Sequence, residues 1–336
     1  MATTSQAPPE ARTDTARTDT AGTSRLRRLH EAGAAPFFVL AALVIAVGAY
    51  DSSFFQAASL ISLLEQAAPL TLLAIGEALV VLTGRIDLSN AGLASLAGVA
   101  LAHGLGSWGP AAVALVVVGA ALCGTLIGVI HITTQVPSFI ITLGFLGIFA
   151  GLSLTTSRAD SILVTDGYGS IEWIFYRIFG LPISYLLVLL VALALMAWMK
   201  ALPIGRRIRA IGLNERAAAH SGIRTRGIVI AVFTASAALA GLAAVFQVAR
   251  LQSAGATTSD TLLLPAIAAV IVGGTAISGG IGGVGRTLCG ALVIALLRVG
   301  LDLVGINAAF QPILYGGIVI MTIAATANRR RGAPVA

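Results

Sequence analysis

Residues 181–226 read LPISYLLVLLVALALMAWMKALPIGRRIRAIGLNERAAAHSGIRTR. The first part is apolar over about the 20 residues that a helix needs to cross a bilayer. The continuous run Leu186-Leu187-Val188-Leu189-Leu190-Val191 lacks the two-residue alternation of a membrane β-barrel strand, so it predicts a helical span. Residues 200–226 then carry seven cations, and positive loops beside spans indicate the cytoplasmic side.

The composition of the whole chain indicates an integral membrane protein. Of its 336 residues, 57% are hydrophobic and 10% are charged, whereas soluble domains carry about 25% charged residues. The sequence pI near 10.2 does not indicate nucleic-acid binding, because the cations stand at segment ends and form no basic face with aromatics. Cys123 and Cys289 lie in apolar runs without metal-ligand spacing, so no metal or other cofactor is expected.

Ten stretches approach the length of a membrane-spanning helix. We therefore expect an all-α bundle of about ten transmembrane helices, at 34–50, 60–83, 89–106, 109–130, 137–157, 181–200, 227–250, 262–278, 286–304 and 309–327. With both termini in the cytoplasm, only Arg158, Arg177 and Arg250 of the 21 basic residues lie in outer loops. One further arginine, Arg298, falls within a span. This asymmetry follows the positive-inside rule.

The chain is predicted to have three parts. Residues 1–33 are polar and rich in threonine, and they have too few apolar groups to offset the entropy of ordering, which predicts a disordered cytoplasmic tail. Residues 34–327 are expected to form the transmembrane domain, with a cytoplasmic loop at 201–226, and residues 328–336 a second cytoplasmic tail. The arginines before Ala34 also resemble the start of a signal peptide, but an uncleaved first span is favoured because the remaining chain is membrane-embedded.

The one sizeable outer segment, residues 158–180, is acidic and aromatic. It contains Asp160, Asp166, Glu172, Trp173, Phe175, Tyr176 and Phe179. Aromatics in such a place suit a helix that lies in the membrane interface. A docking site for an outer partner is the alternative.

Within the basic loop, residues 205–223 predict a short surface helix. Asn214 is a favoured N-cap residue and Gly222 is a favoured residue after a helix end, and the segment between them is rich in alanine. A small helix on the cytoplasmic face of a membrane bundle can serve as a handle for a soluble partner, such as a motor. A merely solvated basic loop is the alternative.

Two glycine-rich breaks lie between spans, at residues 83–92 and 280–287. The second, GIGGVGRT, matches a dinucleotide fingerprint and nearly matches a phosphate loop. Both motifs require a preceding soluble strand and a helix packed on a parallel sheet, whereas membrane-length apolar runs flank these glycines. We therefore expect a tight interhelical turn with close backbone approach. Paired glycine breaks in a transporter point towards its pathway.

Charged groups inside spans are costly, at roughly 2.5–3.5 kcal/mol at a helix centre. The charged residues that fall inside or near the end of a span are Glu65, Glu77, Arg298 and Asp302. They either line a polar pathway or form structural pairs, such as Glu77 with Arg298. His103 and His131 lie near span ends without an obvious acidic partner in the sequence, so we expect ordinary interfacial residues rather than proton relays.

With these features in place, the chain resembles permease subunits of the ribose-type branch of ABC sugar importers. Four stretches carry the resemblance: residues 84–89 (GRIDLS), 136–144 (VPSFIITLG), 211–223 (IGLNERAAAHSGI) and 266–275 (AIAAVIVGGT). The resemblance covers the chain from about residue 60 to the end, and the four stretches are specific in order and spacing.

The resemblance implies a permease of the bacterial cytoplasmic membrane that pairs with a second permease subunit, identical or different. It also implies a cytoplasmic ABC ATPase engaged by residues 205–223, and an extracytoplasmic binding protein that delivers a sugar. ATP hydrolysis would belong to the partner, so the chain itself is expected to be no enzyme. The residues expected to contact the ATPase or to shape its docking helix are Arg206, Gly212, Asn214, Glu215, Ala218 and Gly222.

The expected solute pathway is polar, because Asp, Asn and Gln side chains supply donors and acceptors that match sugar hydroxyls. The candidates are Asp87, Asn90, Gln135, Gln247, Asn307 and Gln311. Such groups equally hold membrane helices together.

The chain departs from its relatives at polar positions, which leaves the solute open. Arg85 stands where relatives often have glycine, Leu263 and Pro265 stand where an acidic pair is usual, and Ala150 replaces an arginine. The alternatives are an ABC permease for a nucleoside, a polyol or a branched-chain amino acid, and a proton- or sodium-coupled secondary transporter. A membrane enzyme has no support, because no cluster of nucleophile, base or metal ligands is recognisable.

Overall fold

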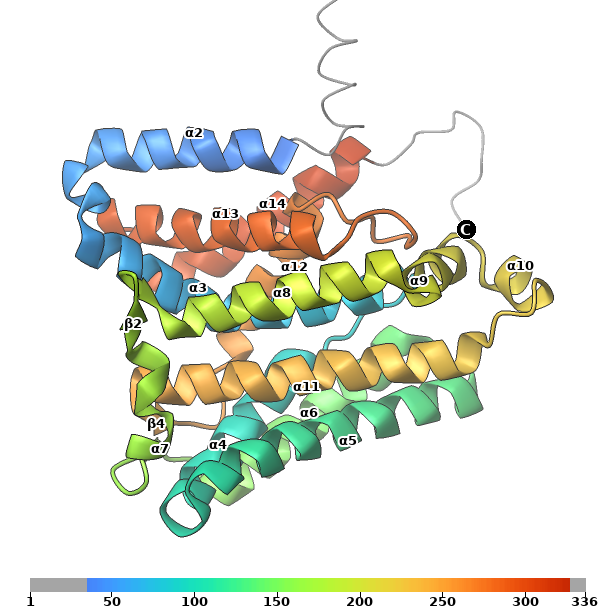
Figure 1. Cartoon of the computed structure of the whole chain (residues 1–336), viewed down its shortest axis with the longest axis horizontal. Coiled ribbons are helices and arrows are strands. Elements are labelled where there is room, and N and C mark those ends of the chain that lie inside the picture. The colour runs from blue at the N-terminus through green and yellow to red at the C-terminus, as the bar shows by residue number, and fades with distance from the viewer. Residues whose placement is uncertain (1–34, 327–336) are drawn as a thin grey trace, which may run out of the picture. The chain divides into compact units, whose positions relative to one another are not determined.

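The computed structural model describes residues 35–326. All of them except Ala35 belong to one compact unit. The predicted tails, 1–33 and 328–336, lie outside the described residues. The described part is almost entirely helical, and its long helices lie roughly side by side (Figure 1). The prediction of an all-α fold is therefore confirmed apart from a few two-residue strands.

The longest helices have at least 16 residues. They are α2 (Ala35–Tyr50), α3 (Ala57–Leu82), α4 (Asn90–Trp108), α5 (Pro110–Thr134), α6 (Ser138–Ser157), α8 (Ile183–Ala201), α11 (Thr225–Leu251), α13 (Val284–Leu303) and α14 (Gln311–Thr326). The shorter helices are α7 (Gly169–Glu172), α9 (Pro203–Leu213), α10 (Glu215–His220) and α12 (Leu263–Val272). The 3-10 turns are η1 (Ser52–Phe55), η2 (Trp173–Phe175), η3 (Asp260–Leu262) and η4 (Ala308–Phe310). The strands pair antiparallel, β1 (Ile162–Leu163) with β4 (Ser253–Ala254) and β2 (Arg177–Ile178) with β3 (Leu181–Pro182).

Each predicted span coincides with one of these helices, since a long apolar run is a local property of the sequence. Six described helices, α3, α5, α6, α8, α11 and α13, are long and apolar enough to cross a membrane. α4 is long enough but less apolar, and α2, α12 and α14 are apolar but shorter. The structure thus has the character of an integral membrane protein, and the total of about ten spans remains a prediction.

The span expected at 262–278 is too long. Its helix, α12, has 10 residues, which rise only about 15 Å, or half of a bilayer core. It ends early because Gly274 adopts a φ of +79°, a conformation that glycine takes without steric cost. Residues 275–283 then form a loop that leads into α13.

The central helices of the bundle are α3 and α11. In their most apolar stretches 61% and 67% of the residues are buried, against 22% in α5 and α6. Small residues bring the helices close together: a Cβ added to Gly124 of α5 would lie 2.4 Å from the carbonyl oxygen of Phe233 in α11. Membrane helices associate through such packing, because lipid gives no hydrophobic drive between them. Outward-facing side chains such as Leu122, 64% exposed, suit contact with lipid.

The two ends of the bundle differ in charge. One end, which we call the basic end, carries the loop 83–89, the helices α9 and α10, and the loop 275–283, which contact one another. The cations of the basic end are Arg85, Lys200, Arg206, Arg207, Arg209, Arg216, Arg224, Arg226 and Arg286. The opposite end carries residues 158–182 and the turn after α11, joined through β1 and β4. Which end faces the cytoplasm remains a prediction.

The segment 158–180 does not form the single interfacial helix that its aromatics predict. It contains the one-turn helix α7, two short strands and the turn η2. Gly167 and Gly180 adopt φ values of +76° and +79°, which interrupt any longer helix. Trp173 and Phe179 are nevertheless exposed, as side chains at a membrane interface are.

Candidate functional site

The basic loop forms two helices rather than one. α9 begins at Pro203, a favoured first residue of a helix, and it buries Ile208 and Ile211 while Arg206 and Arg207 stay exposed. The sequence prediction missed this helix. The sequence does carry a signal for it: Ile204, Ile208 and Ile211 are spaced by four and three residues, which places them on one face of a helix.

α10 is the short helix predicted between Asn214 and Gly222, and this prediction is confirmed. The side-chain oxygen of Asn214 accepts a hydrogen bond from the amide of Ala217 at 3.0 Å. At the other end Gly222 has a φ of +81°, and the amide of Ile223 donates to the carbonyl of Ala218. Ala218 is buried whereas Ala217 and Ala219 are exposed, so α10 packs against its neighbours through Ala218.

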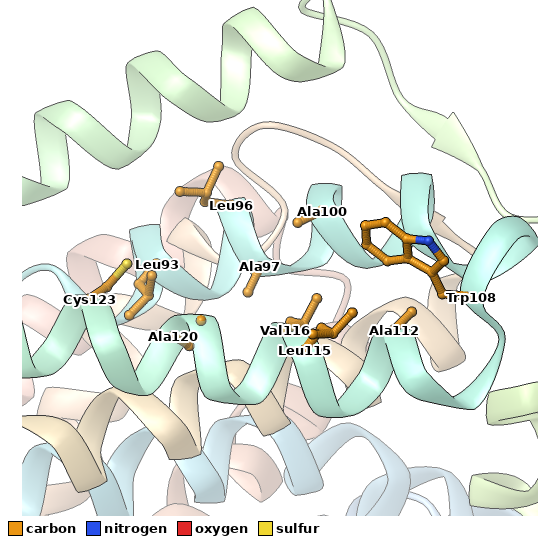
Figure 2. A pocket seen from close by; sticks show the side chains of 11 residues that line it. Leu93, Leu96, Ala97, Ala100, Trp108, Ala112, Leu115, Val116, Ala120 and Cys123 are labelled. Carbon is orange, nitrogen blue, oxygen red and sulfur yellow. The ribbon is translucent and has the colours of Figure 1, made fainter.

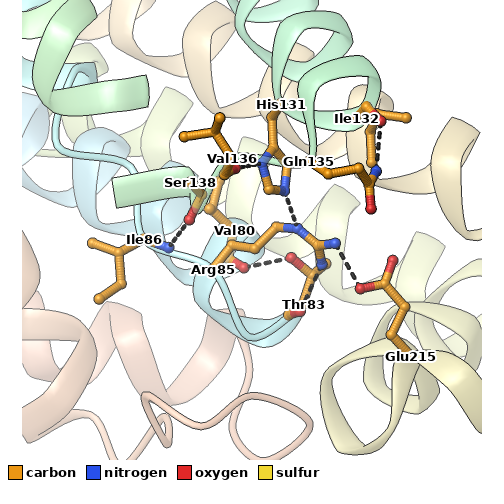
Figure 3. Close-up of polar contacts among 10 residues, drawn as sticks. All are labelled: Val80, Thr83, Arg85, Ile86, His131, Ile132, Gln135, Val136, Ser138 and Glu215. Carbon is orange, nitrogen blue, oxygen red and sulfur yellow. Dashed lines mark hydrogen bonds and ion pairs between the residues drawn. The ribbon is translucent and has the colours of Figure 1, made fainter. Parts of the chain in front are cut away.

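Arg85 links α10 to the membrane helices (Figure 3). Its Nη2 donates to Oε2 of Glu215 in α10 at 2.8 Å, and this ion pair crosses 130 residues of sequence. Its Nε donates to Nε2 of His131, in the last turn of α5, at 2.7 Å. Its Nη1 donates to the carbonyl of Thr83 at 3.0 Å. The Arg85 side chain is only 10% exposed, whereas that of Glu215 is 42% exposed, so the pair is shielded from solvent on the Arg85 side alone.

His131 has a defined role in this network. Arginine is always a donor, so Nε2 of His131 accepts and its Nδ1 carries the proton. Nδ1 donates to the carbonyl of Val136 at 2.8 Å. The neutral ring is thus the form that fits, because a second proton would face the N–H of Arg85. His131 thus holds Arg85 in place through Nε2, and the expectation that it is an ordinary interfacial residue rather than a proton relay stays a prediction.

The loop 83–89 is anchored on its other side by α6. The hydroxyl of Ser138 accepts from the amide of Ile86 at 3.2 Å, and the hydroxyl of Thr142 accepts from the amide of Leu88 at 3.1 Å. These bonds satisfy backbone amides that have no secondary-structure partner, as buried backbone requires.

Three backbone segments meet at Gly84, Gly212, Gly279 and Gly280, which we call the glycine junction. A Cβ added to Gly212 would lie 2.1 Å from the carbonyl oxygen of Leu82 and 2.4 Å from the amide nitrogen of Gly280. A Cβ added to Gly279 would lie 2.8 Å from the Cα of Gly84. The amide of Gly280 also donates to the carbonyl of Leu82 at 3.0 Å. The close backbone approach expected of the glycine-rich turn is confirmed.

The four stretches that carry the resemblance therefore form one connected region. Residues 84–89 contact 136–144 through the serine and threonine hydroxyls, and they contact 211–223 through the Arg85 ion pair and the glycine junction. The stretch 266–275 leads directly into the loop of Gly279 and Gly280. The region joins the exposed helices α9 and α10 to the interior of the bundle.

Two buried acids, Glu77 of α3 and Asp87 of the loop 83–89, lie next to each other. The amide of Asp87 donates to Oε1 of Glu77 at 3.2 Å, and Asp87 Oδ1 accepts from the amide and hydroxyl of Ser89 at 3.0 and 2.5 Å. The hydroxyl of Ser236 in α11 donates to Asp87 Oδ2 at 3.4 Å. Desolvation raises the pKa of the Asp87 carboxyl above its ordinary value, while the hydrogen bonds from Ser89 and Ser236 lower it.

Asn90 belongs to the same buried cluster. Its amide nitrogen donates to the carbonyl of Leu73 at 3.2 Å, and its side-chain oxygen has no partner among the described residues. Asp87 and Asn90 are each 2% exposed. The structure thus brings these two pathway candidates together, in a cluster that is closed to solute in this conformation.

Replacing Asp87 by alanine is expected to destabilise the protein by about 1–3 kcal/mol, because the polar groups of Ser89 and Ser236 would stay buried without their acceptor. Thermal unfolding of the purified chain in detergent measures the effect. Asp51→Ala is the matched control: Asp51 accepts from the amide of Ser53 at 2.8 Å with the same two-residue spacing, but it is at the surface. Equal losses in the two variants would contradict a special role for the buried site.

The remaining pathway candidates lie apart from this cluster. Gln135 ends α5 with a φ of +57°, and its side chain donates to a carbonyl of its own helix. Asn307 is an exposed cap of η4, so its geometry gives no support to a place in a buried pathway. Gln311 is buried and donates to Asp302 at 2.8 Å.

Gln247 lies in a separate polar patch towards the opposite end of the bundle. The hydroxyl of Ser95 donates to Asp260 at 2.7 Å and accepts from the amide of Ser259 at 2.9 Å. Ser95 and Ser259 border a cavity of about 10 Å³ together with Gln247, whose side-chain oxygen has no partner among the described residues. That volume accommodates about one water molecule.

The structural pair of Glu77 with Arg298 is not formed. Glu77 accepts from Asp87, and its second oxygen has no hydrogen-bond partner in the described part of the chain. Arg298 lies elsewhere, beside Gln66 and Tyr315. Spacing along the sequence could not distinguish these neighbours, because they come from different helices.

An apolar groove of about 290 Å³ lies between α4 and α5 (Figure 2). It is lined by Leu93, Leu96, Ala97, Ala100, Trp108, Ala112, Leu115, Val116, Gly119, Ala120 and Cys123. Apart from the indole and the thiol, these side chains offer no hydrogen bond to a solute rich in hydroxyls. The groove is therefore distinct from the polar region described above.

Comparison with known proteins identifies the family. A family model described as the permease component of a branched-chain amino acid transport system matches residues 59–323. The ribose import permease of Bacillus subtilis (strain 168) is 32% identical over 89% of this chain and 93% of the relative. The ribose import permease of Escherichia coli (strain K12) is 33% identical over 84% of this chain and 90% of the relative.

The D-allose transport system permease of Escherichia coli (strain K12) is 31% identical over 86% of this chain and 89% of the relative. No solved structure matches. Together with the apolar helices, these relatives make the chain a multi-pass protein of the bacterial cytoplasmic membrane and a transport component. The resemblance to ABC importer permeases is confirmed. The chain belongs to the family of branched-chain amino acid transport system permease components, which includes bacterial ribose and allose permeases.

Proposed function

We propose that this chain is the membrane-spanning permease subunit of an ATP-driven importer that moves a monosaccharide across the cytoplasmic membrane. The observation that carries the proposal is the contact of α9 and α10 with the loop 83–89, because it connects an exposed basic surface to the buried Asp87 cluster. The ribose and allose permeases among the relatives support a monosaccharide as the solute.

In this proposal about ten helices cross the membrane and both termini lie in the cytoplasm. That orientation places the basic end inside, as the positive-inside rule requires. The exposed helices α9 and α10 then face the compartment that holds ATP. A solute-binding protein would approach the opposite end, where residues 158–180 lie.

A cytoplasmic ATPase subunit would bind α9 and α10. The residues proposed as its contacts, or as the residues that shape its docking surface, are Arg206, Gly212, Asn214, Glu215, Ala218 and Gly222. A motor shifts a conformational equilibrium only as far as it binds the two states differently. Because the end of α9 is packed against the end of α3 and the loop 275–283, α9 can hardly move without them.

The proposed pathway opens alternately to each side, in a complex with a second permease subunit, identical or different. Asp87, Asn90, Gln247 and Gln311 are the candidates that the bundle buries. Their burial supports a closed pathway, which a conformational change would have to open. Hydroxyl-rich solutes would exchange hydrogen bonds with such groups.

Two further candidate functions differ in solute or in energy source. The description of the matching family favours a branched-chain amino acid as the second candidate solute, and a nucleoside or polyol would use the same machinery. A proton- or sodium-coupled transporter would instead use an acid within a span, Glu65 or Glu77, and it would need no ATPase.

Uptake by reconstituted vesicles tests the proposal. Vesicles that contain this chain, its ATPase and its binding protein are expected to accumulate radiolabelled ribose or allose against a gradient only when ATP reaches the ATPase. Ionophores that collapse proton and sodium gradients should leave the rate unchanged. Uphill accumulation by this chain alone would overturn the proposal, and accumulation of leucine but no sugar would replace the solute and keep the ATP-driven mechanism.

A further inference from the structure

A larger cavity lies at the basic end, and none of the residues proposed for the solute pathway lines it. It has a volume of about 600 Å³ and lies between the end of α8, the helix α9, the loop 275–283 and the start of α13. Its wall contains Lys200, Arg209 and Arg286, and no acidic residue lines it. Three cations from three separate elements thus converge on one hollow.

These cations have no acidic partner in the described part of the chain. Arg209 donates only to the carbonyl of Gly282, at 3.4 Å, and neither Lys200 nor Arg286 makes a side-chain hydrogen bond or ion pair there. The one ion pair found among the described residues, Arg85 with Glu215, lies outside this cavity. Uncompensated cations around a concave surface raise the local concentration of anions.

Backbone donors add to the positive field of the cavity. Val284, Gly285 and Arg286 form the first turn of α13, where amides have no acceptor within the helix, and all three residues line the cavity. The amide of Gly283 is already used, since it donates to the hydroxyl of Thr275 at 3.4 Å. Free amides at the start of a helix favour a phosphate or carboxylate group, in addition to the three cationic side chains.

The cavity also has an apolar wall. Met196 and Met199 line it from the last turns of α8, and Ile281, which is 56% exposed, stands at its rim. Leu193 and Trp198, also in α8, have exposed side chains, at 57% and 45%. An exposed apolar helix surface with a tryptophan near its end is typical of a helix that faces lipid at the membrane interface.

From this combination we propose that the cavity binds the phosphate-bearing headgroup of an anionic phospholipid, with the acyl chains along α8. The cations and the amides of α13 hold the phosphate, and Met196 and Met199 contact the glycerol and upper acyl carbons. Basic pockets between membrane helices at a bilayer surface are suited to such headgroups. The site borders the proposed ATPase contact, because α9 forms part of its wall, but it does not depend on which sugar is carried.

Lipid binding to the purified full chain tests this site. Native mass spectrometry in detergent, with added phosphatidylglycerol or phosphatidylcholine, is expected to show at least tenfold tighter binding of phosphatidylglycerol. Substituting Lys200→Gln, Arg209→Gln and Arg286→Gln together should remove that preference. The control variant carries Arg207→Gln, Arg216→Gln and Arg226→Gln, which remove the same charge from exposed positions of the same end that do not line the cavity.

The outcomes separate the cavity from general charge attraction and from other anions. A control variant that loses the preference as fully as the cavity variant would overturn the proposal. So would inorganic phosphate or glycerol phosphate displacing phosphatidylglycerol at equal concentration, because the acyl chains would then add nothing. Loss of the ATPase complex in the cavity variant with unchanged lipid preference would assign the cavity to an acidic protein segment instead. A melting temperature within about 2 °C of the wild type shows that the variants remain folded.

Discussion

Replacing Gly212 by alanine is expected to reduce uptake at least tenfold and to destabilise the protein by about 3 kcal/mol, at the upper end of the usual cost of overpacking. The added methyl group would lie 2.1 Å from the carbonyl oxygen of Leu82 and 2.4 Å from the amide nitrogen of Gly280. Both neighbours are backbone atoms of buried residues, so neither can rotate away as a side chain would. The end of α9 would have to separate from the end of α3.

Gly212→Ala should reduce ATP-driven uptake by more than it reduces the amount of folded protein. If the glycine junction passes movement from α9 to the interior, a separated junction leaves α9 able to bind the ATPase but unable to move α3 and the loop 275–283. We therefore expect Gly212→Ala to retain the ATPase during co-purification while ATP-driven uptake is lost. ATP hydrolysis that continues without uptake would be the signature of this uncoupling.

Gly227→Ala is the matched control for this substitution. Gly227 lies in the first turns of α11 at the same end of the bundle, and a Cβ added there would meet no atom within 4 Å. Alanine in a helix is favoured over glycine by roughly 0.5–1 kcal/mol, so this variant should be as stable as the wild type or more stable. Normal uptake by Gly212→Ala, with a normal melting temperature, would show that the junction has room to relax and carries no movement.

The sequence predicts local features of this fold well. The apolar runs predict the long helices because the length of a run depends only on neighbouring residues. The bounds of α10 are predictable for the same reason, since Asn214 caps the amide three residues on and Gly222 ends the helix through its own positive φ. The span predicted at 262–278 is longer than α12 because the apolar run continues through Gly273 and Gly274. In the structure the positive φ of Gly274 ends the helix.

The contacts that build the candidate site could not be predicted from spacing. Gly84, Gly212 and Gly279 were each recognisable as glycines in breaks or loops, but their meeting depends on how three distant segments pack. In the sequence, Arg85 is notable only because related chains often have glycine at this position. Its partner Glu215 lies 130 residues away along the chain. Long-range pairs of this kind carry no periodic signal in a single sequence.

Reversing the charge of Glu215, as Glu215→Arg, is expected to abolish ATP-driven uptake. The change places a second cation against Arg85, whose side chain is 10% exposed and has Glu215 as its counter-ion. Two like charges at the present distance of 2.8 Å cannot remain in contact, so α10 should move away from the loop 83–89. The free energy of unfolding should change by only about 1 kcal/mol, because the Glu215 side chain is 42% exposed and solvent screens the pair.

The double substitution Arg85→Glu with Glu215→Arg distinguishes the ion pair from a direct contact with the ATPase. If the pair only holds α10 in place, the exchanged charges should restore the contact and recover most of the uptake, because opposite charges again face each other. If Glu215 instead binds the ATPase directly, the double variant should stay inactive and lose the ATPase during co-purification. If the single variant Glu215→Arg keeps normal uptake and retains the ATPase, Glu215 has neither role. In that case the motor would not require α10 to stay attached to the loop 83–89.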